Sequence, residues 1–251
     1  MANVVDWFRI NKLSLNISKT NYILFRSHRK PIPQSNINIL IDGNIVPQVT
    51  CTKFLGVYID QHLNWSEHIK IISMKIAKNI GVLNRLASYV PNNVLLNLYY
   101  SLIYPYLAYC NIVWASNYNY RLQKLIILQK RAIRVIARVS PRSHTNQYFN
   151  KYKILKIPQI NTLQISEFMY KFTHKLLPLV FNDYFSITSD THTYPTRQIE
   201  FYRGVFARTN TRMFAIRSMG PSVWNNIPIS TRHAPNLKSF KKSVCARLLD
   251  D

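Results

Sequence analysis

The sequence predicts an α+β fold that is predominantly helical, with a small β-hairpin region, a helical bundle and a less regular C-terminal region. After residue 11, apolar residues alternate with a period of two as far as residue 60, and then recur every three or four residues, as strands and helices require. The length of 251 residues and the hydrophobic fraction of 47% are sufficient to bury a core. We therefore expect three parts, residues 1–62, 63–140 and 141–251.

The first part is expected to combine the end of a helix with short strands. Residues 2–10 have the pattern of the last turns of a helix, which Asn11 would close as a C-cap. The alternation over residues 12–25 predicts a strand. Asp42-Gly43 is the strongest hairpin signal in the chain, because this pair readily adopts the positive φ angles of a tight turn.

The stretch CTKFLGVYID, residues 51–60, predicts a buried strand with Gly56 in its middle. A glycine inside a strand costs backbone entropy and contributes no side chain to packing. We expect it to mark a bulge, or a place where another backbone or a ligand comes close. Lys53, just upstream, would then be placed to meet a phosphate.

Two amphipathic helices are predicted in the second part. Asn64 and Glu67 have the spacing of a capping box at the start of the first helix, and Pro91 closes it. The second helix is expected from about Tyr120 to Val139. The residues expected to face inward are Ile69, Ile72, Ile76, Ile80, Leu83, Leu122, Leu125, Ile126, Ile133 and Ile136. The basic residues of the outer faces, which are the candidate nucleic-acid-binding residues, are Lys75, Lys78, Arg85, Arg121, Lys124, Arg131, Arg134 and Arg138.

A run without charged residues, 86–120, separates these two helices. Its centre, residues 94–114, is long enough to cross a bilayer. Polar residues and Pro105 interrupt it, and its tyrosines are dispersed, whereas a membrane span would keep them at its ends. A buried helix kinked at Pro105 is therefore favoured over a membrane span.

Beyond Pro141 the pattern is weaker. Residues 160–177 predict a helix, residues 180–208 an irregular segment, and GPSVWNNIP, residues 220–228, a packed turn around its tryptophan. A terminal helix is expected over residues 236–249. Its inward-facing residues would be Leu237, Phe240, Val244 and Leu248.

The charge balance is strongly one-sided. The chain has 33 Lys and Arg against 10 Asp and Glu, which gives a formal net charge of +23 and a pI near 10.1. Residues 61–140 contain a single acidic residue, Glu67, whereas ordinary solvated helix faces mix charges of both signs. The composition predicts a polyanionic partner, most simply nucleic acid. Solubility alone and an anionic membrane surface are the alternatives.

The residue patterns favour a binding module over an enzyme. The carboxylates do not pair into a metal or acid–base site by local pattern, and two-metal phosphoryl transfer needs clustered carboxylates. The three cysteines are far apart and form no CxxC, and neither a GxSxG nor a phosphate-binding glycine loop occurs. We expect no cofactor, no metal and no small-molecule substrate. The N-terminus has no signal-peptide pattern, so an intracellular location, nuclear or cytoplasmic, is expected.

Several blocks of the chain resemble the reverse transcriptase of jockey-like, non-LTR retrotransposons, in the region just after the paired catalytic aspartates. The first two blocks are specific, and the later ones follow in the expected order. The blocks are WFRINKLSLNISKTNYILF, TKFLGVYIDQHLNWSEHI, LIYPYLAYCNIVW, LQKLIILQKRAIRVI, MGPSVWNNIP and LKSFKKSV. The resemblance covers nearly the whole chain.

This resemblance implies a layout for the three parts. Residues 1–62 would be the C-terminal remnant of the polymerase palm, in which Lys19 matches a lysine that faces the departing pyrophosphate. Lys53–Asp60 would match the primer-grip hairpin, whose backbone supports the primer strand. Residues 63–140 would form the thumb, and residues 141–251 would help to hold template RNA.

The resemblance also implies what this chain would not do. The aspartates that hold Mg²⁺ in the intact family have no counterparts among these 251 residues. The chain as given would therefore not polymerise, and Lys19 would be idle. The implied partner is RNA or an RNA/DNA hybrid, bound mainly through its phosphates. A non-functional retroelement remnant is the alternative, and a membrane-associated protein using residues 94–114 is a less favoured one.

Overall fold

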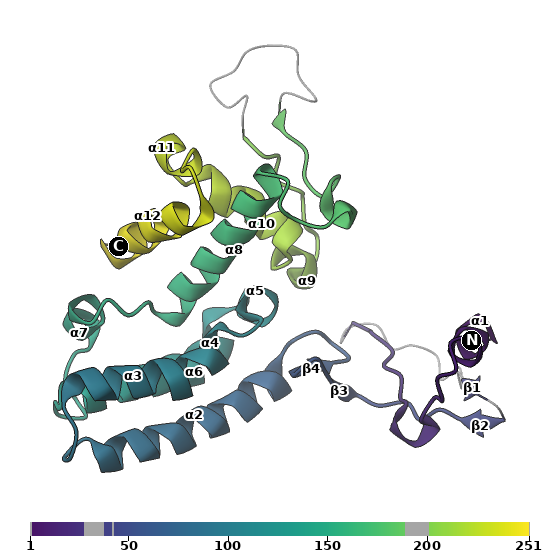
Figure 1. The fold of residues 1–251 in the computed structure, drawn as a ribbon, viewed down its shortest axis with the longest axis horizontal. Helices are drawn as coiled ribbons and strands as arrows, with labels where there is room; N and C mark the ends of the chain where they lie inside the picture. The colour runs from purple at the N-terminus through teal and green to yellow at the C-terminus, as the bar shows by residue number, and fades with distance from the viewer. Residues whose placement is uncertain (1, 28–37, 42, 189–200, 251) are drawn as a thin grey trace. The chain divides into compact units, whose positions relative to one another are not determined.

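A computed structural model describes residues 2–27, 38–41, 43–188 and 201–250 (Figure 1). Its internal contacts divide the chain into two compact units, Met1–Lys70 and Ile71–Asp251. Among the described residues, the first unit holds two small antiparallel hairpins, and helices dominate the second unit. The expected α+β, predominantly helical fold class is confirmed. The division into three parts stays a prediction.

The first unit begins with helix α1, Ala2–Ile10. Asn11 closes it as predicted, because its backbone N–H and its side-chain amide both donate to the Trp7 carbonyl, at 3.1 and 2.8 Å. The strand predicted over residues 12–25 is wrong, apart from an isolated parallel bridge between Tyr22 and Gln48. The Asn16 side chain instead accepts the Lys19 backbone N–H at 3.2 Å and caps a 3-10 turn, Ile17–Lys19. Such local side-chain bonds compete with strand pairing.

Two hairpins follow. Strands β1, Leu40–Ile41, and β2, Asn44–Ile45, pair antiparallel where the hairpin was predicted, with Gly43 at φ +77°, while Asp42 lies outside the described residues. The single buried strand that the residue pattern predicts over 51–60 is wrong, whereas the hairpin that the resemblance implies at Lys53–Asp60 is present. These residues form a hairpin of β3, Cys51–Phe54, and β4, Val57–Asp60.

Gly56 lies in the tight turn of this second hairpin, not inside a strand. Leu55 and Gly56 both have positive φ, +45° and +87°, as a two-residue turn with the twist of a hairpin requires. Phe54 and Leu55 are exposed at the tip, while Val57 and Asp60 are buried. Asparagine, aspartate and glycine usually occupy such turns, so a leucine at the first position conceals the turn in the sequence.

Substitutions in this turn are expected to act in opposite directions. Leu55→Asn should stabilise the hairpin by about 0.5–1 kcal/mol, because asparagine adopts positive φ more readily than leucine. Gly56→Ala should destabilise it by about 1 kcal/mol, since a Cβ is strained at φ +87°. Hydrogen exchange of the β3 and β4 amides measures both effects. Equal protection in both variants would contradict the turn assignment.

The link from β4 to the first long helix is organised by one carboxylate. Asp60 Oδ1 accepts the backbone N–H groups of His62 and Asn64, at 3.0 and 3.2 Å, and its Oδ2 accepts that of Trp65 at 2.7 Å. Helix α2 follows, Ser66–Leu86, with Ser66 N–H bonded to Asn64 Oδ1 at 2.9 Å. Asn64 thus accepts a backbone N–H at the helix start, as expected. The capping box predicted with Glu67 is wrong, because the Asn64 N–H donates to Asp60 and not to Glu67.

The second unit continues from α2 through a series of helices. They are α3 (Asn92–Leu102), α4 (Tyr104–Ala108), α5 (Asn111–Trp114), α6 (Asn119–Ala137), α7 (Asn146–Lys151), α8 (Ile157–Thr173), the 3-10 helix η2 (Leu179–Phe181), α9 (Asn210–Met213), α10 (Ile216–Asn225), α11 (Ile229–Arg232) and α12 (Leu237–Asp250). The charge-free run becomes α3, α4 and α5, with the first break at Ile103, two residues before Pro105. A break at this proline was predicted, although the run forms three helices and not one kinked helix.

The inward faces predicted for α2 and α6 are confirmed: each named residue is buried, except Ile126, which is half-buried. Leu95, Tyr99, Ile103, Leu107 and Trp114 of the charge-free run are fully buried beside them. Tyr100 and Tyr109, by contrast, are exposed, so this run has an outer side. None of the described helices combines the length and apolar composition that crossing a bilayer requires.

Helix α8 is the centre of the C-terminal region, where it contacts α4, α5, α10 and α12 (Figure 1). The packed turn predicted over 220–228 is wrong, since most of it belongs to α10. A Cβ at Gly220 would lie 2.7 Å from Met169 Sδ of α8, so glycine permits this close packing. Gly220, Pro221 and Trp224 are buried together. Tertiary packing therefore overrides the local preference of a Gly-Pro pair.

Candidate nucleic-acid interface

The outer face of α2 has a short cationic stripe. Met74, Lys78, Gly81 and Arg85 follow the spacing of one helix face, and all four are exposed. A Cβ at Gly81 would meet nothing within 4 Å, so this face is open. Lys75 is exposed at the edge of the stripe, with its Nζ 5.5 Å from the centre of the Tyr106 ring. Two of the three α2 candidates, Lys78 and Arg85, thus share a stripe.

Helix α6 has a longer stripe of the same kind. Tyr120, Lys124, Ile127, Arg131 and Arg134 follow one another at spacings of three and four residues. Tyr120, Lys124, Ile127 and Arg131 are exposed. From Tyr120 to Arg131 the stripe rises about 17 Å along the helix. It therefore offers spaced positive charges, which suit a phosphate backbone.

Three of the predicted α6 arginines also have roles within the protein. Arg134 Nε donates to the Ser143 carbonyl at 2.9 Å, and an Arg138 amino group donates to the Val90 carbonyl at 2.6 Å. Arg138 is the left-handed C-cap of α6, at φ +54°. Arg121 Nε donates to the Tyr120 hydroxyl at 3.0 Å. These contacts orient the guanidinium groups while their charge remains.

The candidates of the first unit lie on separate elements. Lys19 is exposed at the end of the 3-10 turn, and Lys53 is exposed in β3, opposite Tyr58 of β4. Gly56 is in the hairpin turn, where its glycine character is explained by φ. The structure therefore explains Gly56 without a ligand, and the ligand contacts of Lys19 and Lys53 stay predictions.

Sequence reasoning missed the buried polar residues that hold the helices in place. Gln129 Nε2 donates to the Tyr99 hydroxyl at 3.0 Å and to the Leu155 carbonyl at 2.9 Å, and its Oε1 accepts the Ile157 N–H at 3.1 Å. One side chain thus connects α6, α3 and the start of α8. Its signal in the sequence is a polar residue four positions from Leu125 and Ile133, on an otherwise apolar face.

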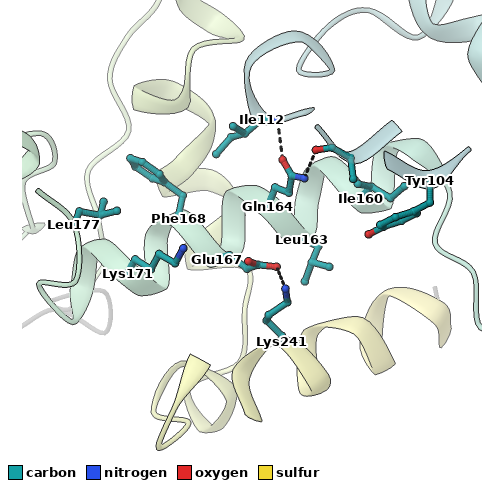
Figure 2. A pocket seen from close by; sticks show the side chains of 11 residues that line it. Tyr104, Ile112, Ile160, Leu163, Gln164, Glu167, Phe168, Lys171, Leu177 and Lys241 are labelled. Atoms are coloured by element: carbon teal, nitrogen blue, oxygen red, sulfur yellow. Dashed lines mark hydrogen bonds and ion pairs between the residues drawn. The ribbon is translucent and has the colours of Figure 1, made fainter. Parts of the chain in front are cut away.

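The second unit also contains a cavity of about 410 Å³, lined from α4, α5, α8 and α12 (Figure 2). Glu167 Oε1 and Lys241 Nζ form an ion pair across it at 2.9 Å. Gln164 accepts the Ile112 N–H at 3.1 Å and donates to the Ala108 carbonyl at 2.6 Å. Glu167 and Lys241 thus bind each other, Gln164 binds backbone groups of α4 and α5, and most of the other lining residues are apolar. The polar contacts around the cavity therefore hold α8 against α4, α5 and α12.

The titratable groups with shifted pKa values are not poised for nucleophilic chemistry. Burial raises the pKa of the Cys51 and Cys245 thiols, which favours their neutral form. Burial also raises the pKa of the Tyr104 phenol. Within the described ranges, no three His, Cys, Asp or Glu side chains come together as metal ligands. The clearest chemical feature is the set of exposed cations.

Fold and surface together define a strongly basic, predominantly helical protein with cationic stripes on two helices. Over 135 residues it is 26% identical to the "Probable RNA-directed DNA polymerase from transposon X-element" of Drosophila melanogaster. The match covers 52% of this chain and 14% of the Drosophila protein, so the chain spans a small part of that relative's length. No protein-family profile and no solved structure matches the chain. The chain therefore contains a region similar to a non-LTR retrotransposon reverse transcriptase.

Proposed function

We propose that this chain is a nucleic-acid-binding portion of a retrotransposon RNA-directed DNA polymerase, and that it holds a template–primer duplex by its phosphates. The observation that carries the proposal is the charge of the helix faces. Residues 61–140 contain ten basic residues and one acidic residue, and five of the basic side chains lie in the outer stripes of α2 and α6. The similarity to an RNA-directed DNA polymerase supports RNA or an RNA/DNA hybrid as the partner.

The proposed role is binding and not nucleotidyl transfer. Two-metal phosphoryl transfer needs clustered carboxylates to hold the cations, and the carboxylates of this chain do not cluster by local pattern. Lysine and arginine side chains on a helix face bind phosphates without reading bases. Affinity should therefore depend strongly on salt and weakly on sequence. We place this activity inside the cell, where a retrotransposon polymerase would meet its template.

Removing two cations of the α2 stripe is expected to weaken hybrid binding. Lys78→Gln combined with Arg85→Gln should make the slope of log K against log salt shallower by about 2, because each residue would neutralise one phosphate. Near 0.1 M salt this corresponds to roughly 50-fold lower affinity. Fluorescence anisotropy with a labelled RNA–DNA hybrid, titrated with the full chain at several salt concentrations, measures both quantities.

The matched control lies on the same helix. Lys70 Nζ is 3.7 Å from the Glu67 carboxylate, so Glu67→Gln with Lys70→Gln removes one charge of each sign. This pair of substitutions should leave the slope unchanged. If the wild-type affinity does not change between low and high salt, or if the control loses as much affinity as the Lys78 and Arg85 variant, the proposal is wrong.

A further inference from the structure

An exposed aromatic platform stands at the start of α6. The rings of Tyr118 and Tyr120 are stacked, with centroids 5.8 Å apart and planes 20° from parallel. Tyr120 is 69% exposed, which is unusual for an aromatic ring so well ordered by neighbours. This ring is therefore presented to solvent at a defined angle.

Groups distant in the sequence set that angle. Phe214, just after α9, packs edge-on against Tyr118, with ring centroids 4.8 Å apart. Arg121 contacts Tyr120 directly. Its Nε donates to the Tyr120 hydroxyl at 3.0 Å, and its guanidinium carbon is 5.4 Å from the centre of the Tyr120 ring. Tyr120 is thus supported through Tyr118 on one side and bound through its hydroxyl by a cation.

The platform continues into the cationic stripe of α6. Lys124 is exposed one turn after Tyr120 on the same face, and Arg131 is exposed further along it. A planar surface next to a row of positive charges is the arrangement with which proteins bind single-stranded nucleic acid, since bases stack on the ring while cations follow the backbone. A base-paired duplex cannot use the ring in this way, because its bases are already stacked on one another.

We propose that Tyr120 is a stacking site for an unpaired base of single-stranded RNA or DNA, and that Arg121 and Lys124 bind the phosphates beside that base. This inference rests on the proposed nucleic-acid affinity of the chain and adds a second mode of binding to it. Duplex phosphates would bind along the stripes, whereas a single strand would also place a base on the platform.

The test compares single-stranded and duplex probes on the full chain. Tyr120→Ala should weaken the binding of a labelled 12-nucleotide uridine or thymidine strand by about tenfold, while affinity for an RNA–DNA hybrid of equal length stays within about twofold. The salt slope should not change, because no charge is removed. Tyr120→Trp, which keeps a ring, should bind as wild type does. A 12-mer lacking its bases should bind wild type and Tyr120→Ala equally.

Tyr89→Ala is the matched control, because Tyr89 is 84% exposed in the turn after α2 and should not affect either probe. Equal single-strand affinity of wild type and Tyr120→Ala would overturn the inference, as would an equal loss for the base-free strand. The two proposals fail in different experiments: the Lys78 and Arg85 variant tests duplex binding, whereas Tyr120→Ala tests base stacking by a single strand. The uridine and thymidine strands show whether RNA or DNA is preferred.

Discussion

Replacing Gln129 with alanine is expected to lower the free energy of unfolding of the second unit by about 3 kcal/mol. The side chain is buried and makes three hydrogen bonds, to Tyr99, Leu155 and Ile157. The substitution would leave a hydroxyl, a carbonyl and an N–H without this partner, in a region closed to water. Each such group costs about 1–3 kcal/mol when it stays unpaired, and partial relaxation recovers some of this cost.

Hydrogen exchange of the α3 and α6 amides is the appropriate measurement, because the chain has two units and whole-chain unfolding would mix them. The control is Gln123→Ala on the exposed side of the same helix, which should change the free energy by less than about 0.5 kcal/mol. Similar exchange in both variants would show that Gln129 does not anchor α6. Loss of the Gln129 bonds should also weaken nucleic-acid binding, because the cationic stripe depends on the position of α6.

Replacing Asp60 with alanine is expected to destabilise the link between β4 and α2 by about 3 kcal/mol. Its carboxylate is buried and accepts three loop N–H groups, those of His62, Asn64 and Trp65. Two residues of this loop, Leu63 and Trp65, have positive φ, +52° and +64°, which bulky side chains adopt at a cost. The bonds to Asp60 offset that strain.

Faster exchange of the His62, Asn64 and Trp65 amides in Asp60→Ala would be the direct sign of this loss. Asp60→Asn keeps one carbonyl oxygen and should lose about half as much. Asp6→Ala serves as the control: its carboxylate is exposed and pairs only at the surface with Arg9, at 3.6 Å. Unchanged loop amides in Asp60→Ala would rule out the organising role.

The sequence predictions were most often correct where the structure depends on residues close together in the sequence. The period of 3.6 identified the buried faces of α2 and α6, because burial against any apolar neighbour imposes that period. Asn11 was recognised as a cap, and Asn64 as a residue that binds the helix start, because such bonds are local. The predicted reciprocal bond from Glu67 was wrong, since Asp60 takes the Asn64 N–H. The prediction of a strand at 12–25 was wrong for a related reason. The local hydrogen bonds of the Asn16 side chain favour a 3-10 turn over the strand that the alternating apolar pattern indicates.

For the candidate site, sequence predicted which residues are cationic and on which helix face they lie, but not how they are oriented. The bonds of Arg134 to Ser143 and of Arg138 to Val90 join segments that no pattern connects. The residue pattern missed the hairpin turn at Leu55 and Gly56 because leucine is rare at positive φ, whereas the family resemblance implied a hairpin there. The binding roles of the cations stay predictions until affinities are measured.

The sequence by itself determined the helical character of the second unit, its buried faces, and the one-sided charge that points to a polyanion. These properties depend on composition and on short periods, which are written along the chain. Only the tertiary structure decided that Gly220 and Pro221 lie in a helix packed on α8, and that Phe214 braces Tyr118 beside Tyr120. Such contacts join residues tens of positions apart, and their energies come from packing and buried hydrogen bonds, which have no local signature.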